Sequence, residues 1–217
     1  MIDAEKIISL YEKIPPYDSM YNSPQYISED ELTYSYILKN MKAGSILDIG
    51  CGTGCALEYL PSKKYTGIDL SPIMINDAKK KYPTCDFLVK DALEVTGMYD
   101  NIICLYGSYL HVEHIIDICY RSLSQDGQAF FHIQTPHRNQ TVIGTLEKVL
   151  QIDMEVISKD KIDYLKRSFK VKIIKMNAFN KWKKNLSLPL YRLSLKIDHY
   201  LPIPMEYYTW ILLHLHR

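Results

Sequence analysis

The chain has 217 residues and a formal net charge of +1, with 47% hydrophobic and 24% charged residues, the balance of a globular protein of one to one and a half typical domains. No apolar run approaches the roughly 18 residues of a membrane span, and the first residues lack the pattern of a signal peptide. Five cysteines without a Cys-x-x-Cys pair argue against a disulfide scaffold and a zinc finger. We therefore expect a cytoplasmic protein without a membrane partner.

Charge is distributed unevenly along the chain. Residues 1–146 hold 12 Lys/Arg and 18 Asp/Glu, whereas residues 147–217 hold 14 Lys/Arg and 7 Asp/Glu. One interpretation is two solvated faces that attract each other, and another is a basic rim for an anionic acceptor or a nucleic acid. The basic residues are spread out rather than gathered in one block, which favours the first interpretation.

The N-terminal segment predicts two helices. An amphipathic pattern over residues 2–14 ends at Pro15-Pro16, because proline cannot continue a helix. A tyrosine-rich connector follows, and its side chains could cover a ligand, since aromatic faces attract a sulfonium, or simply pack as a surface segment. The sequence Ser28-Glu-Asp-Glu31 has the pattern of a capping box, which predicts a helix from Glu29 to about Met41.

A glycine-rich turn is the most specific feature of the chain. The apolar run 45–49 leads into Gly50-Cys-Gly-Thr-Gly54, a helix is expected next, and a second apolar run ends at Asp69. This order predicts a nucleotide-type pocket, where glycines let the backbone approach a ligand and a carboxylate accepts hydrogen bonds from ribose hydroxyls. Cys55 stands where the dinucleotide fingerprint has glycine, and no P-loop occurs, so a cofactor without phosphate is favoured.

The following segments alternate between helix and strand. Ser71-Pro72 predicts a helix start, with the helix running to about Lys81. Strands are expected near 64–69, 85–89, 101–105 and 128–134, with a helix over 108–123 that turns Leu110, Ile115, Ile118 and Cys119 inward. Such alternation predicts a doubly wound parallel sheet. Beyond residue 135, the pattern predicts helices at 141–150 and 158–167 and strands at 170–176 and 207–215, with no element over 177–206.

Four stretches carry a family resemblance. ILDIGCGTG resembles the first motif of class I S-adenosylmethionine-dependent methyltransferases. DLSPIMINDAKKKYP and DFLVKDALEV resemble the second and third elements, and the segment from Tyr99 to Ile133 resembles the fourth strand, its helix and the fifth strand. The resemblance covers residues 46 to about 135, in the family's order. It implies an α/β, doubly wound Rossmann-like sheet of seven strands, with an antiparallel last strand inserted beside the sixth.

The resemblance also implies an organisation within one methyltransferase domain. Residues 1–41 would form N-terminal helices and a lid, and 42–136 the cofactor-binding core. Residues 137–206 would cover the acceptor and include the sixth strand, and 207–217 would form the final strand. Both terminal regions are thus expected to act as helical caps over the site.

The resemblance implies a set of cofactor-binding residues: Asp48, Gly50, Cys51, Gly52, Gly54, Asp69, Leu70, Met74, Asp91, Ala92, Leu105 and Tyr21. Each has an alternative structural interpretation. Asp69 and Asp91 could cap helices, Leu70 and Met74 could be core residues, and Cys51 could be a small buried residue.

Candidate catalytic residues follow the fourth strand. Tyr106 lies at the position nearest the transferring methyl, and His111 could serve as a general base. Adenine- and glutamine-directed enzymes carry [DNS]-P-P-[YFW] there, whereas this chain has Leu105-Tyr-Gly-Ser108; Ile14-Pro-Pro-Tyr17 precedes the glycine turn and is interpreted as a helix stop. The His111-x-x-His114 spacing allows metal binding, but no carboxylate motif supports it and no metal is expected.

These observations predict a methyltransferase that moves a methyl group from S-adenosylmethionine to an O or N atom of a small molecule. The reaction would be in-line displacement with S-adenosylhomocysteine as product, and the enzyme would contribute alignment and water exclusion. Two alternatives stay open. One is an RNA or protein methyltransferase that uses the basic C-terminal third, although nucleic acid is not favoured, and the other is a non-catalytic cofactor-binding module. The oligomeric state is not predicted.

Overall fold

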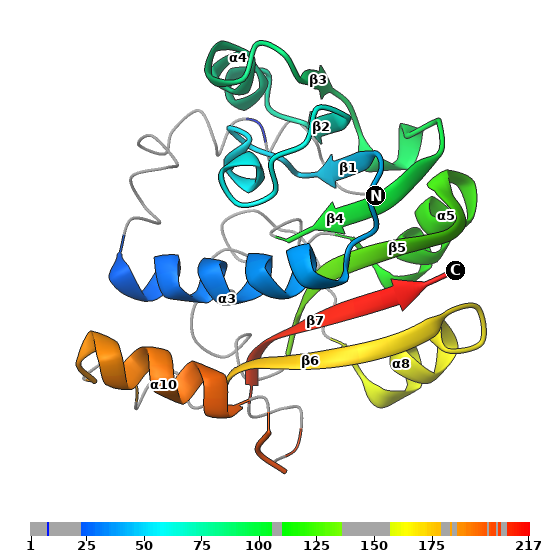
Figure 1. The fold of residues 1–217 in the computed structure, drawn as a ribbon. Coiled ribbons are helices and arrows are strands. Elements are labelled where there is room, and N and C mark those ends of the chain that lie inside the picture. Colours follow the sequence, from blue (N-terminus) through cyan, green and yellow to red (C-terminus); the bar gives the residue numbers. More distant parts are fainter. Residues whose placement is uncertain are drawn as a thin grey trace.

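A computed structural model describes residues 8, 23–105, 110–135, 157–178, 183, 186–198, 200–202, 204 and 208–217. Its centre is a seven-stranded sheet in the order β3-β2-β1-β4-β5-β7-β6 (Figure 1). The strands are β1 (Ile46–Ile49), β2 (Tyr65–Asp69), β3 (Asp86–Val89), β4 (Tyr99–Cys104), β5 (Leu123–Gln134), β6 (Lys170–Ala178) and β7 (Tyr208–His216).

Strand directions confirm the expected topology. β3, β2, β1, β4 and β5 pair in parallel, whereas β7 is antiparallel to both β5 and β6. The last strand is therefore inserted beside the sixth. The strand order reverses between β1 and β4, and in open α/β sheets ligands bind at the carboxyl ends of the strands at such a switch point.

Helices cover both faces of the sheet (Figure 1). On one face, α5 (Val112–Ser122) and α8 (Lys159–Leu165) bury apolar side chains such as Ile115 and Leu165 in a cluster that includes Leu47 of β1. On the other face, α3 (Pro24–Asn40) and α4 (Pro72–Lys81) pack Ile37 and Ile75 in a cluster that includes Ile46. β1 is buried throughout because consecutive side chains point to opposite, covered faces.

The start of α3 differs from the prediction. The helix begins at Pro24 with Ser23 as its N-cap, and the Tyr26 N–H donates to the Ser23 hydroxyl at 3.3 Å. Ser28 lies inside the helix, where its hydroxyl donates to the Pro24 carbonyl at 2.7 Å. The capping-box prediction was wrong because Ser23-Pro24 is a second start signal one turn earlier, with proline at the first helical position.

The element after the glycine turn is also shorter than predicted. Only one 3₁₀ turn, η1 (Cys55–Glu58), follows Gly54, and a second 3₁₀ turn, η2 (Ala92–Glu94), follows β3. Leu60 is buried and Pro61 follows it directly. A longer helix is prevented because the segment reaches β2 within a few residues and proline cannot extend it.

Other elements match the sequence pattern closely. The Met74 N–H donates to the Ser71 hydroxyl at 3.3 Å, which confirms Ser71 as the N-cap of α4. The Lys161 N–H likewise donates to the hydroxyl of Ser158 at the start of α8. α5 begins at Val112, later than expected, but its predicted inward residues are buried.

One helix was missed. α10 (Leu188–Asp198) lies in the stretch 177–206, to which no element was assigned, and it contains Pro189 in its first turn. A proline tolerated at that position is uninformative about the helix that follows it. The helices expected at 2–14 and 141–150 lie outside the described residues, apart from Ile8. Among the described residues, no helix is long and apolar enough to cross a membrane.

Candidate functional site

The glycine turn occupies the carboxyl end of β1, beside the switch point. Gly50, Gly52 and Gly54 all have positive φ angles, of 70°, 53° and 82°. The N–H groups of Gly50 and Cys51 both donate to the Ile68 carbonyl on β2, at 2.8 and 3.0 Å. Because positive φ is strained for residues with a Cβ, three glycines are what this close series of turns requires.

Asp69 ties this turn to the end of β2. Its two carboxylate oxygens accept hydrogen bonds from the Gly52 N–H at 3.0 Å and the Ser71 N–H at 2.9 Å. Burial raises the pKa of Asp69, and those backbone bonds partly oppose the rise. A carboxylate offers about four lone-pair sites, so Asp69 can accept further hydrogen bonds from a ligand while it holds the turn.

The space in front of Gly52 is open. Within the described part of the chain, a Cβ built at this residue would meet no atom within 4 Å beyond its chain neighbours, although Gly52 is half-buried. At Gly54, in contrast, a Cβ would lie 3.1 Å from Phe87 and Tyr82 side-chain atoms. The middle of the turn thus presents backbone toward free space, which suits a ligand that approaches the chain closely.

Asp48 lies beneath the turn and is buried. The Tyr65 hydroxyl donates a hydrogen bond to the Asp48 carboxyl, from a neighbouring strand. Burial raises the pKa of Asp48 to about 7, the Tyr65 hydrogen bond opposes this rise, and the Asp69 charge adds to it. An acid with such a pKa is poised to ionise when a cation comes near, because an opposite charge favours the carboxylate.

Two tyrosines at this site were not identified from the sequence. Tyr65 contacts Asp48 directly, and buried Tyr34 of α3 stacks on Tyr59 with ring centroids 4.5 Å apart. Burial raises the pKa of Tyr34, and the Asp48 charge raises it further. Their apolar positions in a strand and a helix resemble ordinary core positions, so no sequence signal separated them from the core.

The segment after β3 contributes Asp91 and Ala92, the residues expected near the adenine of the cofactor. The Leu93 N–H donates to Asp91 at 2.8 Å, so Asp91 caps η2, which was the structural alternative for this residue. Ala92 is buried directly after it. Leu70 is half-buried at the end of β2 and Met74 is buried in α4. These side chains stand at the same edge as the glycine turn, and their contact with a ligand stays a prediction.

Cys51 and Leu105 are both buried at this edge. Burial raises the pKa of the Cys51 thiol, so the thiol stays protonated and behaves as a small apolar group. Leu105 directly follows β4, the neighbour of β1 across the switch point. The sheet therefore brings together eleven of the predicted cofactor residues, all except Tyr21, at the carboxyl ends of four adjacent strands.

The predicted catalytic residues are placed only in part. Tyr106 and Tyr21 lie outside the described residues, as does Tyr17 of the tyrosine-rich connector. His111 is the half-buried N-cap of α5, and its ring centroid is 5.5 Å from that of His114. The described residues contain no group of three or more His, Cys, Asp or Glu side chains that could hold a metal ion.

Comparisons with known proteins find similarity to methyltransferases. A family profile described as "Methyltransferase domain" matches residues 46–127, from β1 into β5. Uncharacterized protein RP028 of Rickettsia prowazekii (strain Madrid E) is 28% identical over 144 residues, which are 58% of this chain and 57% of that protein. Demethylmenaquinone methyltransferase of Chlorobaculum tepidum (strain ATCC 49652 / DSM 12025 / NBRC 103806 / TLS) is 43% identical over 54 residues, 24% of this chain and 22% of the relative. The matches span little more than half the length of these curated relatives, or less.

Solved structures show the same fold. Geranyl diphosphate C-methyltransferase from Streptomyces coelicolor A3(2), in complex with Mg²⁺, geranyl diphosphate and S-adenosyl-L-homocysteine, has a TM-score of 0.66 at 11% identity, and the match covers 99% of this chain and 98% of that chain. The order of the motifs, the sheet topology and the matching family profile agree. Residues 46–127 therefore match a methyltransferase-domain profile, and the chain as a whole has the fold of solved methyltransferase structures.

Proposed function

We propose that this chain transfers a methyl group from S-adenosylmethionine to an O or N atom of a small molecule. The observation that carries the proposal is the glycine turn, whose middle residue, Gly52, faces open space while Asp69 holds its N–H. A turn that served only to connect a strand to a helix would not need open space in front of Gly52.

The residues present fit this cofactor. Gly52 offers backbone to a close ligand, Asp69 retains lone pairs for ribose hydroxyls, and Asp48 is a buried acid that an ammonium group would ionise. Asp91 and Ala92 follow the next strand, at the expected adenine position. When bound, S-adenosylmethionine supplies an electrophilic methyl group on a sulfonium. The described site residues bring carboxylates rather than phosphate-binding lysines, which agrees with a cofactor without phosphate.

The chain contributes mainly position and water exclusion. The acceptor atom must stand in line with the methyl group, so the residues that follow β4 set its direction. Leu105 is buried there and offers an apolar wall. His111 is the group we propose as general base, for an acceptor that must lose a proton early; Tyr106 is proposed to face the acceptor.

A small acceptor is favoured by the names of the relatives. Demethylmenaquinone and geranyl diphosphate, which the names of two of them mention, are small molecules. The lysines of β6, Lys170, Lys172 and Lys175, lie four strands away from β1 in the sheet order. A basic surface that far from the glycine turn gives little support to a macromolecular acceptor beside the methyl group.

Two measurements test the proposal. Calorimetric titration with S-adenosylhomocysteine should show one site per chain. Gly52→Val should abolish this binding and leave the circular dichroism spectrum of the protein unchanged. Transfer of radiolabelled methyl into a host extract, separated by size and nuclease sensitivity, should label the small-molecule fraction. Label in RNA or protein would contradict the proposed acceptor class. Binding without any transfer would contradict the catalytic role and favour a cofactor-binding module.

A further inference from the structure

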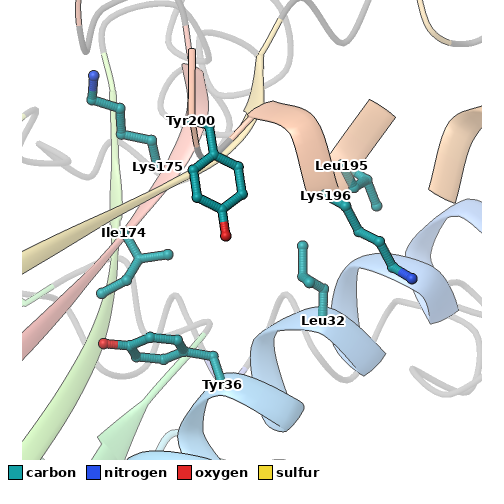
Figure 2. A pocket seen from close by; sticks show the side chains of 7 residues that line it. All are labelled: Leu32, Tyr36, Ile174, Lys175, Leu195, Lys196 and Tyr200. Carbon is teal, nitrogen blue, oxygen red and sulfur yellow. The ribbon is translucent and has the colours of Figure 1, made fainter. Parts of the chain in front are cut away.

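A second cavity lies away from the glycine turn, between α3, β6 and α10 (Figure 2). Its volume is about 290 Å³, close to the lower end of the range for small-molecule sites. Its walls come from Leu32 and Tyr36 on α3, Ile174 and Lys175 on β6, and Leu195 and Lys196 on α10, with Tyr200 beyond the helix. The cavity is thus built by three elements that are far apart in the sequence.

Specific contacts hold the helices that form these walls. The Tyr191 hydroxyl donates to Glu29, and Arg192 donates to the Ser28 hydroxyl at 3.0 Å. A buried ion pair between Lys183 and Asp198 anchors the other end of α10. Because α10 is tied to α3 and to its own preceding segment, these two helical walls are held in place, whereas Tyr200, which also lines the cavity, is 81% exposed.

The chemistry of the lining is apolar with a positive rim. Figure 2 shows the Tyr200 hydroxyl pointing into the space between Ile174 and Leu32. The amines of Lys175 and Lys196 lie on opposite sides, so that the aliphatic stems contribute wall and the charges stay outside. None of the seven lining residues is acidic. An aromatic or alicyclic molecule with a negative group matches apolar walls, aromatic rings and a cationic rim.

Strand register separates this cavity from the glycine turn. Ile174 pairs with Leu212, and Leu212 pairs with His132 of β5. Cys104 of β4 pairs with Phe131, so Leu105 stands next to His132 on the same row. Three strand spacings of about 4.8 Å each place Ile174 roughly 14 Å from the end of β4. Buried Leu212 occupies part of the interval, so the two sites are distinct.

We propose that the cavity between α3, β6 and α10 is a second ligand site, which binds a small organic anion with an aromatic or alicyclic body and leaves the glycine turn accessible. This proposal does not depend on the reaction at the glycine turn. Ligand binding there rests on apolar contact with Leu32, Tyr36 and Ile174, and selectivity for anions rests on Lys175 and Lys196.

The test uses two fluorescent probes of the same shape. 1-Anilinonaphthalene-8-sulfonate is an anion, and N-phenyl-1-naphthylamine is its uncharged analogue. With the folded 217-residue chain, we expect both to bind one site, the anion at least fivefold more tightly at low salt, because salt screens the attraction to the lysine ammonium groups. Failure of both probes to bind, or equal affinity for both, would overturn the proposal.

Paired variants locate the probe. Leu32→Trp on α3 fills the cavity and should weaken binding at least tenfold, whereas Leu38→Trp, on the same helix but 54% exposed, should leave it unchanged. Lys196→Glu should weaken binding of the anionic probe and leave binding of the neutral probe unchanged. This variant keeps the test valid if Leu32→Trp fails to fold. Equal effects of Leu32→Trp and Leu38→Trp would place the probe elsewhere and overturn the proposal.

Competition distinguishes the two sites. Saturating S-adenosylhomocysteine should not change the affinity for either probe. Displacement of the probe would mean that the cavity is part of the methyl-transfer site, and would overturn the proposal of a separate site. If the chain does not bind S-adenosylhomocysteine at all, the proposed function fails while the probe measurements still decide the second site.

Discussion

The two halves of the sheet place opposite chemistry at their surfaces. In the half formed by β3, β2, β1 and β4, Asp48 and Asp69 are acids whose pKa burial raises. In the half formed by β5, β7 and β6, His214 is a base whose pKa burial lowers. We propose that the first half meets a polar, cationic cofactor.

His214 illustrates the second half. Its ring lies between the Tyr36 hydroxyl, 3.0 Å from Nδ1, and the Gln128 amide oxygen, 2.7 Å from Nε2. Burial, together with the nearby charges of His216 and Lys172, lowers the pKa of His214 to about 4. This histidine is therefore neutral at pH 7 and joins α3 to two strands, whereas Asp48 is an acid near its midpoint. The difference is that His214 keeps one protonation state near neutral pH, whereas the charge of Asp48 can change there.

The largest effect should come from removing the open space at the glycine turn. Gly52→Val places a side chain where the ligand approaches, so S-adenosylhomocysteine affinity should fall at least 1000-fold, about 4 kcal/mol. Gly97→Val is the matched control, since Gly97 also has a positive φ, of 103°, but precedes β4 at the opposite edge. Calorimetry should show unchanged affinity for the control. Equal losses in both variants would mean that strain, not ligand contact, is responsible.

Asp48→Asn should remove the pH dependence of stability that the Asp48 carboxyl gives the protein without cofactor. The folded pKa of about 7 exceeds the ordinary 3.8, so the folded state binds more protons, and stability is lost as pH rises from about 4 through 7. The stability of the variant relative to the native chain should rise by as much as about 4 kcal/mol between pH 4 and pH 8. Urea unfolding at several pH values measures this difference.

The same variant should bind S-adenosylhomocysteine at least tenfold more weakly, because a neutral amide cannot pair with an ammonium group. Comparison with the native chain at each pH cancels the contribution of His214, which has the opposite sign: stability from that residue is lost as pH falls from about 6.5 to 4. A parallel pH dependence in both proteins would contradict the role of Asp48.

In the other half, Asp198→Ala should destabilise the fold by about 3 kcal/mol. It leaves the Lys183 ammonium buried without its carboxylate partner, and an unpaired buried charge is costly. Asp163→Ala removes an exposed pair with Lys166 and should change stability by less than about 0.5 kcal/mol. The melting temperature of Asp198→Ala should therefore be clearly lower than that of Asp163→Ala. Similar melting temperatures would mean that the Lys183–Asp198 pair does not anchor α10.

Asp69→Ala should affect cofactor binding less than Gly52→Val does. It removes the acceptor for the Gly52 N–H and the expected ribose contact, and should weaken S-adenosylhomocysteine binding at least tenfold, about 1.4 kcal/mol. Asp86→Ala on β3, where the side chain is exposed, serves as the control. Unchanged affinity of Asp69→Ala for S-adenosylhomocysteine would contradict the prediction that Asp69 binds the ribose hydroxyls.

Local signals account for the parts of the fold that were predicted correctly. The start of α4 at Ser71-Pro72 and the cap of α8 at Ser158 depend on neighbouring residues alone. The glycine turn is similarly local. At α3 the capping-box pattern at Ser28 gave the wrong start, because the Ser23-Pro24 signal begins the helix earlier; Tyr34 and Ile37, which pack against the sheet, lie in both the predicted and the observed helix.

The sequence by itself determined the methyltransferase resemblance of residues 46–127, the strand alternation and the edge where a cofactor is expected, because a glycine turn followed by a carboxylate needs only short-range spacing. Tertiary structure decided which groups surround Asp48, since Tyr65 reaches it from another strand and Tyr34 from a helix. It also decided the second cavity, because Leu32, Ile174 and Leu195 meet only after α10 folds back on α3. Contacts between residues on different elements leave no local pattern from which they could be predicted, whether 17 positions apart, as Asp48 and Tyr65 are, or much further apart, as Leu32 and Ile174 are.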